Sequence, residues 1–66
     1  MLILSELLLK AGDRIHSFAE LKTALQQAAI ESGTLHFQVD IEPPAYADRP
    51  QNWHDQLEIA FMDAGR

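Results

Sequence analysis

Residues 34–42 read T-L-H-F-Q-V-D-I-E and carry the clearest secondary-structure signal in the chain. Apolar and polar residues alternate strictly along this stretch, and a period of two predicts a β-strand with one buried face and one face in water. The apolar face consists of Leu35, Phe37, Val39 and Ile41, and the polar face consists of His36, Gln38, Asp40 and Glu42. A single strand cannot satisfy its own main-chain hydrogen bonds. We therefore expect it to pair with a less obvious strand, with a second copy of the protein, or with another protein.

The size of the chain bears on the same question. With 66 residues the sequence predicts one small domain over residues 1–66. A domain of this size buries only about 60% of its unfolded surface, and such folds usually gain stability from disulfides, a metal or association. There is no cysteine, which excludes disulfides, thiolate metal sites and cysteine nucleophiles. Association, as a homodimer or with a partner protein, is therefore the expected source of additional stability.

The chain is acidic, with a net charge of −5 that lies mostly in its second half. Five basic residues without a cluster do not suit phosphate neutralisation, so no nucleic-acid binding is expected. An acidic surface suits solubility or a basic partner. The apolar start of the chain lacks a basic flank and a small-residue cleavage site, and it is too short to span a bilayer. These features predict a cytoplasmic protein without a membrane segment.

Two structures compete for residues 2–9. Leucine and alanine recur at helical spacing within residues 4–11, and the stretch is rich in good helix formers, so a short helix is favoured there. Gly12 then stands where a left-handed residue is expected to end the helix. The alternative is a buried strand over residues 2–9, which would pair with residues 34–42 in a βαβ unit. The sequence leaves this choice open.

The second helix has clearer boundaries. The sequence S-F-A-E at residues 17–20 is a capping box, in which the Ser17 hydroxyl and the Glu20 carboxylate bind each other's main-chain N–H groups. An apolar stripe follows on one side of the helix, and Gly33 suits a left-handed C-terminal cap. These features predict a helix over residues 18–31.

A third helix is predicted over residues 50–64. Two successive prolines should end the preceding strand, because proline cannot donate to a ladder. Asp48 is the expected N-cap, Pro50 lies in the first turn, and Gly65 is expected to end the helix. The apolar stripe of this helix consists of Trp53, Leu57, Ala60, Phe61 and Ala64, while Ile59 and Met62 lie off it.

Together these elements predict a small α+β domain with three helices, the first of them short, and one amphipathic strand. The sheet is expected to be completed by self-association or by a partner. The predicted core consists of Phe18, Leu21, Leu25, Phe37, Val39, Ile41, Leu57 and Phe61.

No sequence pattern points to catalysis, a metal or a cofactor. There is no G-x-S-x-G elbow and no glycine-rich phosphate loop. His36 and Asp40 stand four residues apart on a strand, roughly 13–14 Å, which is too far for one site. His54 and Glu58 can touch on a helix, but they are only two of the three or four ligands that zinc needs. We therefore expect neither an enzyme nor a metal or cofactor site.

The candidate site is instead a partner-binding surface. The exposed side of the strand offers a row of polar side chains, and the loop after it carries a tyrosine without an evident role in the core. Tyrosine is enriched among the residues that dominate protein interfaces. The proposed contact residues are His36, Gln38, Asp40, Glu42 and Tyr46.

Two short stretches resemble barstar-like ribonuclease inhibitors, which are small, acidic α/β proteins. These stretches are I-H-S-F-A-E-L at residues 15–21 and N-W-H-D-Q-L at residues 52–57. The strand and the Pro-rich loop separate them at a spacing that differs from that family. The resemblance therefore assigns no function and no site residues.

The expected function is that of a small acidic protein-interaction module that acts by binding another protein. It would be an inhibitor or adaptor of the kind that bacteria and their mobile elements encode. An obligate homodimer with a structural role is the alternative, with two strands over residues 34–42 paired across a two-fold axis. A DNA mimic, whose spaced carboxylates imitate phosphates, is a weaker alternative.

Overall fold

The predicted second helix forms as α2, Phe18–Ser32, in a computed structural model that describes residues 1–64. The Ser17 hydroxyl accepts a hydrogen bond from the Glu20 N–H at 3.1 Å. The Glu20 carboxylate accepts from the His16 N–H at 2.6 Å, one residue before the N–H that a standard capping box uses. At the other end Gly33 has φ 64°, and its N–H donates to the Ala29 carbonyl at 3.0 Å. Both ends of this helix are thus confirmed within one residue.

Both structures considered for the start of the chain are present in succession. Strand β1, Leu2–Ile3, runs directly into helix α1, Leu4–Ala11, which has the bounds that its leucine spacing predicts. β1 pairs in parallel with β2, Phe37–Gln38, so that Leu2 lies opposite Phe37 and Ile3 lies opposite Gln38. The predicted strand therefore has a partner within its own chain, and two strands are present where one was expected.

The expectation of a strand over all of residues 34–42 is wrong, because only Phe37–Gln38 forms a ladder. The reason lies in β1, which supplies two residues before α1 begins, so the ladder has no partner on which to extend. Phe37 and Val39 still pack against the core, as the alternation predicts. Leu35 and Ile41 do not, since 86% and 43% of their surfaces remain exposed.

The end of α1 also differs from expectation. Gly12 has φ −53° and ψ −40°, which is right-handed helical geometry and not the left-handed cap that was expected. The chain continues into a short 3-10 turn, η1, Gly12–Arg14, before Ile15 enters the core.

The last helix, α3, spans Trp53–Asp63 and begins three residues after the predicted start. Asn52 is its N-cap and makes no side-chain cap bond, so the expectation that Asp48 caps this helix is wrong. The expectation for Gly65 lies outside the described residues. Trp53 and Phe61 pack partly buried against the core, and Leu57 and Ala60 are buried, as the stripe predicts.

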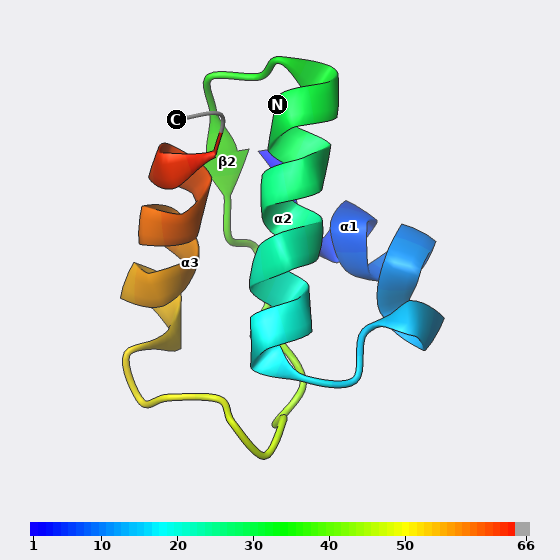
Figure 1. Cartoon of the computed structure of the whole chain (residues 1–66), viewed down its shortest axis with the longest axis vertical. Helices are drawn as coiled ribbons and strands as arrows, with labels where there is room; N and C mark the ends of the chain where they lie inside the picture. Colours follow the sequence, from blue (N-terminus) through cyan, green and yellow to red (C-terminus); the bar gives the residue numbers. More distant parts are fainter. Residues whose placement is uncertain (65–66) are drawn as a thin grey trace.

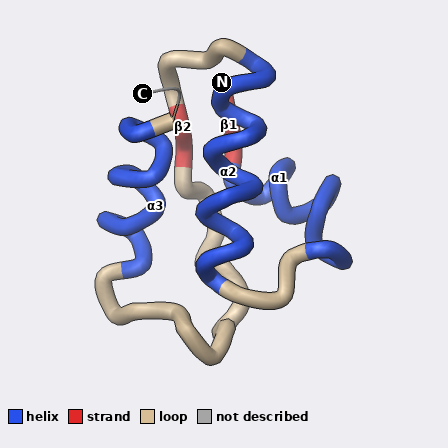
Figure 2. The backbone as a smooth tube through the Cα atoms, viewed as in Figure 1, coloured by secondary structure: helices blue, strands red, loops and turns tan. Residues whose placement is uncertain are grey.

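The arrangement of these elements places α2 and α3 side by side with their chains running in the same direction (Figure 1). The Gln26 side-chain amide on α2 ties them by donating to the Ala60 carbonyl on α3 at 3.1 Å. In Figure 2, α2 passes in front of β1, β2 lies between α2 and α3, and α1 lies beyond α2. The C-terminal ends of α2 and α3 therefore lie at the same end of the molecule as the start of β2 (Figure 1).

The core lies among the three helices and the inner side of the strands. Residues 1–64 contain about 58% helix and 6% strand and form a small α+β fold of three helices and a two-stranded parallel sheet. Its buried cluster consists of Leu4, Leu7, Ile15, Phe18, Leu21, Leu25, Leu57 and Ala60. Of the predicted core residues, only Ile41 is neither in this buried cluster nor packed against it. No helix in residues 1–64 is long and apolar enough to cross a membrane.

Candidate partner-binding site

Asp40, one of the five proposed contact residues, has its carboxylate at the start of α1. Its two oxygens accept hydrogen bonds from the Ser5 N–H at 3.0 Å and from the Ser5 hydroxyl at 2.6 Å. These bonds, led by that of the Ser5 hydroxyl, lower the pKa of Asp40 below its ordinary value. A carboxylate at a helix N-terminus also meets the positive end of the helix dipole. Asp40 therefore holds the loop after β2 onto α1.

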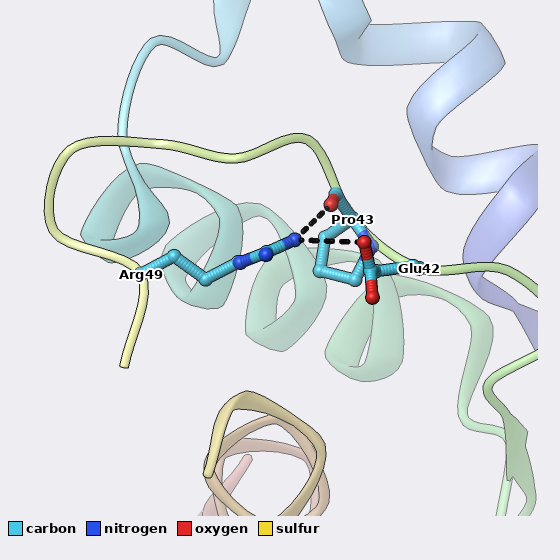
Figure 3. Close-up of polar contacts among 3 residues, drawn as sticks. All are labelled: Glu42, Pro43 and Arg49. Carbon is cyan, nitrogen blue, oxygen red and sulfur yellow. Dashed lines mark hydrogen bonds and ion pairs between the residues drawn. The ribbon is translucent and has the colours of Figure 1, made fainter. Parts of the chain in front are cut away.

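Glu42, the second of these residues, is exposed and pairs with Arg49 across the same loop (Figure 3). The Arg49 guanidinium Nη1 lies 3.4 Å from Glu42 Oε2 and donates to the Pro43 carbonyl at 2.7 Å. The Pro43 side chain is fully buried, so this loop is held by a buried side chain as well as by the Arg49–Glu42 ion pair at the surface. The pair closes the turn between β2 and α3.

The sequence leaves partial burial and an exposed contact equally open for Tyr46, and the structure shows partial burial. Its side chain is half-buried and packs against the core. Burial, together with the nearby charges of Asp48 and Glu20, raises the pKa of the Tyr46 hydroxyl. Tyr46 also shapes the loop, because its carbonyl accepts from the Arg49 N–H at 3.0 Å.

Asp48 was expected to cap α3, but it caps α2 instead. Its carboxylate accepts from the Phe18 N–H at 2.6 Å and from the Ala19 N–H at 3.1 Å, so it caps α2. These two bonds lower the pKa of Asp48. The sequence offered one signal: Ser17 satisfies a single N–H of the first turn, which leaves two N–H groups for another acceptor.

His36 and Gln38 are the two proposed contacts whose side chains are not used by the fold. Both are exposed, and neither side chain makes a hydrogen bond with another residue of the described chain. Successive side chains of a strand point to opposite faces. Phe37 faces α3, so the Gln38 side chain lies on the opposite face of the sheet, whereas His36, just before β2, lines a hollow beside Phe37. The five proposed residues thus do not form one continuous face.

The outer edge of β2 is a feature that the side chains alone do not reveal. The Leu2 N–H donates to the His36 carbonyl at 3.0 Å, as the pairing of Leu2 with Phe37 requires. In a parallel ladder with this register, His36 and Gln38 direct their main-chain groups toward β1, so those of Phe37 and Val39 face the other edge. The sheet formed by residues 1–64 has only two strands, so no strand covers that edge. We call it the outer edge of β2.

An apolar surface adjoins this edge. The Phe37 and Phe61 rings stack with centroids 5.4 Å apart and form part of a hollow of about 240 Å³. A second hollow of about 280 Å³ lies next to it. Leu35 and Met62 line both hollows, and they expose 86% and 62% of their surfaces. We call the two hollows and these side chains the Leu35–Met62 surface.

A polar pair borders this surface. His54 Nε2 lies 3.0 Å from Glu58 Oε1, one turn apart on α3, which confirms that the two side chains touch. Glu58 also lines the smaller hollow, together with His36. The Trp53 ring stacks on His54 with centroids 5.7 Å apart. Within residues 1–64 no cluster of three or more His, Asp or Glu side chains is placed to hold a metal ion.

Comparison of the chain with protein-family models, with curated proteins and with solved structures finds no match.

Proposed function

We propose that the protein is a small protein-interaction module, an inhibitor or adaptor, that binds a partner protein at the outer edge of β2. The observation that carries this proposal is the position of Leu35 and Met62 beside an edge whose main-chain groups face no strand. An extended segment that adds to a sheet edge gains main-chain hydrogen bonds, while pockets beside the edge select its side chains. The edge and the two hollows of the Leu35–Met62 surface supply these two elements.

The exposure of the apolar residues supports the same surface. Single exposed apolar side chains are ordinary, but adjacent ones that line hollows are typical of interaction sites. His36 and Gln38 lie beside the edge with free side chains, so they are the direct contacts among the five proposed residues. Asp40, Glu42 and Tyr46 fasten the loop after β2 and would act on binding through its position.

The proposed module acts in the cytoplasm. Small secreted domains commonly depend on disulfides, which a chain without cysteine cannot form. The net charge of −5 suits a basic partner.

A proline substitution tests the use of the edge. Val39→Pro removes an N–H that faces the outer edge, and Val39→Ala is the control because it disturbs the Val39 side-chain packing but keeps the N–H. The partner is first identified by a photo-crosslinking residue at position 35, with position 9 on α1 as the control, since Leu9 is 85% exposed. With the purified partner, we expect Val39→Pro to weaken binding roughly tenfold or more relative to Val39→Ala.

Two results bear against the proposal. If the two Val39 variants bind the partner equally, its main chain does not use this edge. If crosslinks form equally from positions 35 and 9, the Leu35–Met62 surface has no special part in binding.

A homodimer is the second candidate, because the same edge can pair with the edge of a second copy in antiparallel orientation. Light scattering on a size-exclusion column, over a series of concentrations, separates the two. A mass near twice 7.4 kDa at all concentrations supports the homodimer, and a mass near 7.4 kDa supports a module with an open edge.

A further inference from the structure

We infer that the segment bound at the outer edge of β2 is an extended, basic segment of another protein, with a large apolar side chain close to a Lys or Arg. This inference rests on the proposed function and names the chemistry of the partner.

The apolar requirement follows from the shape beside the edge. A strand added next to β2 would direct alternate side chains toward α3, where the smaller hollow opens beside Phe37 and Phe61. The walls of this hollow also include Leu35 and Met62, so a large apolar side chain of the bound segment would cover exposed apolar surface there. Because Leu35 and Met62 also line the second hollow, a further side chain two positions along the segment can pack on their other side.

The basic requirement follows from the charges around the hollows. Glu58 lines the smaller hollow, and none of the described residues that line either hollow is Lys or Arg. α2 and α3 run in the same direction and both end near this surface (Figure 1), where neither helix has a basic residue in its last turn. Two helix C-termini contribute partial negative charge that attracts a cation. Among the described residues that line the two hollows, His36 is the one side chain that can carry a positive charge.

The same charges disfavour a second copy at this edge. Each copy carries a net charge of −5 and its own Glu58 beside β2, so antiparallel pairing of two edges would bring like charges together. A basic segment meets the opposite charge.

Selection from a peptide library tests this inference. A phage-displayed library of random peptides of about 12 residues, long enough to cover a strand, is selected on the immobilised full chain. We expect enriched sequences to carry a large apolar residue within two positions of a Lys or Arg. A fluorescent peptide of the consensus sequence should bind roughly tenfold or more weakly to Leu35→Asp than to wild type. Leu9→Asp, at an equally exposed position on α1, should change the affinity less than about twofold.

Charge is tested separately from shape. Glu58→Gln keeps the size of the side chain and removes its charge, so it should weaken binding of the same peptide. Raising the salt concentration from about 0.05 to about 0.5 M should weaken binding to wild type more than binding to Glu58→Gln, because salt screens the charge pair.

The contrary outcomes separate this inference from the proposed function. Enriched peptides that lack Lys and Arg yet depend on Leu35 would overturn the inference and leave the interaction module standing. A failure to enrich any peptide whose binding depends on Leu35 would overturn both. A concentration-stable mass of twice 7.4 kDa that Leu35→Asp abolishes would replace the basic segment with a second copy as the occupant.

Discussion

Asp40 and Asp48 belong to one loop and bind the starts of two different helices. Asp40 accepts from Ser5 at the start of α1, and Asp48 accepts from Phe18 and Ala19 at the start of α2. Each aspartate therefore joins the loop after β2 to a helix far away in the sequence. In both cases the hydrogen bonds lower the pKa of the carboxyl group.

A lowered carboxyl pKa makes the fold sensitive to acid. Because the folded-state pKa of Asp48 lies below its ordinary value of 3.8, its contribution is complete above that value and is lost as the pH falls through the folded-state pKa. We expect Asp48→Asn to lower the urea midpoint at pH 7. This difference from wild type should shrink as acid protonates Asp48 in the wild-type protein, and urea unfolding between pH 7 and pH 2 checks it.

Asp13→Asn is the control for that measurement. Asp13 is exposed on η1, and its side chain makes no hydrogen bond with another residue in the described range 1–64. It should leave the urea midpoint nearly unchanged at pH 7. Equal effects of the two substitutions, or a difference that persists unchanged in acid, would show that Asp48 does not stabilise α2 in this way.

The residue scale also shows how far local sequence patterns reach. The role of Ser17 could be predicted because its acceptor and the Glu20 N–H lie three residues apart. The role of Asp48 could not, because its two donors lie about thirty positions earlier in the chain and only the tertiary fold brings them together. A locally plausible cap for α3 was chosen instead.

At the scale of elements, the two described glycines at helix ends have opposite conformations. Gly12 has right-handed helical geometry and room for a Cβ atom, whereas Gly33 lies in the left-handed region with φ 64°. We expect Gly12→Ala to raise the free energy of unfolding by about 0.4–1 kcal/mol, because it restricts the unfolded chain. Gly33→Ala should lower it by about 1–2 kcal/mol, because a Cβ is strained in the left-handed region.

Urea unfolding of the two glycine variants measures both effects under one set of conditions. The test is whether the two changes in the free energy of unfolding have opposite signs, because each substitution adds the same methyl group. Stabilisation by both substitutions would contradict the left-handed end of α2, and destabilisation by both would contradict the helical conformation at Gly12.

The strand shows what an alternating pattern can and cannot predict. Alternation fixes which side chains face the core, and Phe37 and Val39 do so. The alternating pattern does not indicate how long the partner strand is, and that length sets the length of the ladder. β1 has two residues because Leu4 already begins a helix, so Leu35 and Ile41 extend beyond any partner and remain exposed.

At the scale of the whole molecule, the fold class could be predicted and the proposed binding surface only in part. The three helices follow from local apolar spacing, and capping correctly predicts the ends of α2 alone, so the helices could be expected from sequence. The Leu35–Met62 surface could not, because it joins the loop before β2 to the end of α3. His36 was proposed as a contact from its place in the strand, and it lies on this surface, but Met62 was noted only as lying off the helix stripe.

The outer edge of β2 is the feature on which the functional proposal depends, and amide hydrogen exchange followed by NMR measures it directly. The Gln38 N–H faces β1, whereas the N–H groups of Phe37 and Val39 face the outer edge. In the free protein we predict that Phe37 and Val39 exchange roughly tenfold or more faster than Gln38, and that the selected peptide slows their exchange to the rate of Gln38. If Phe37 and Val39 were as protected as Gln38 in the free protein, or if saturating peptide left their exchange unchanged, the edge would not be the binding site.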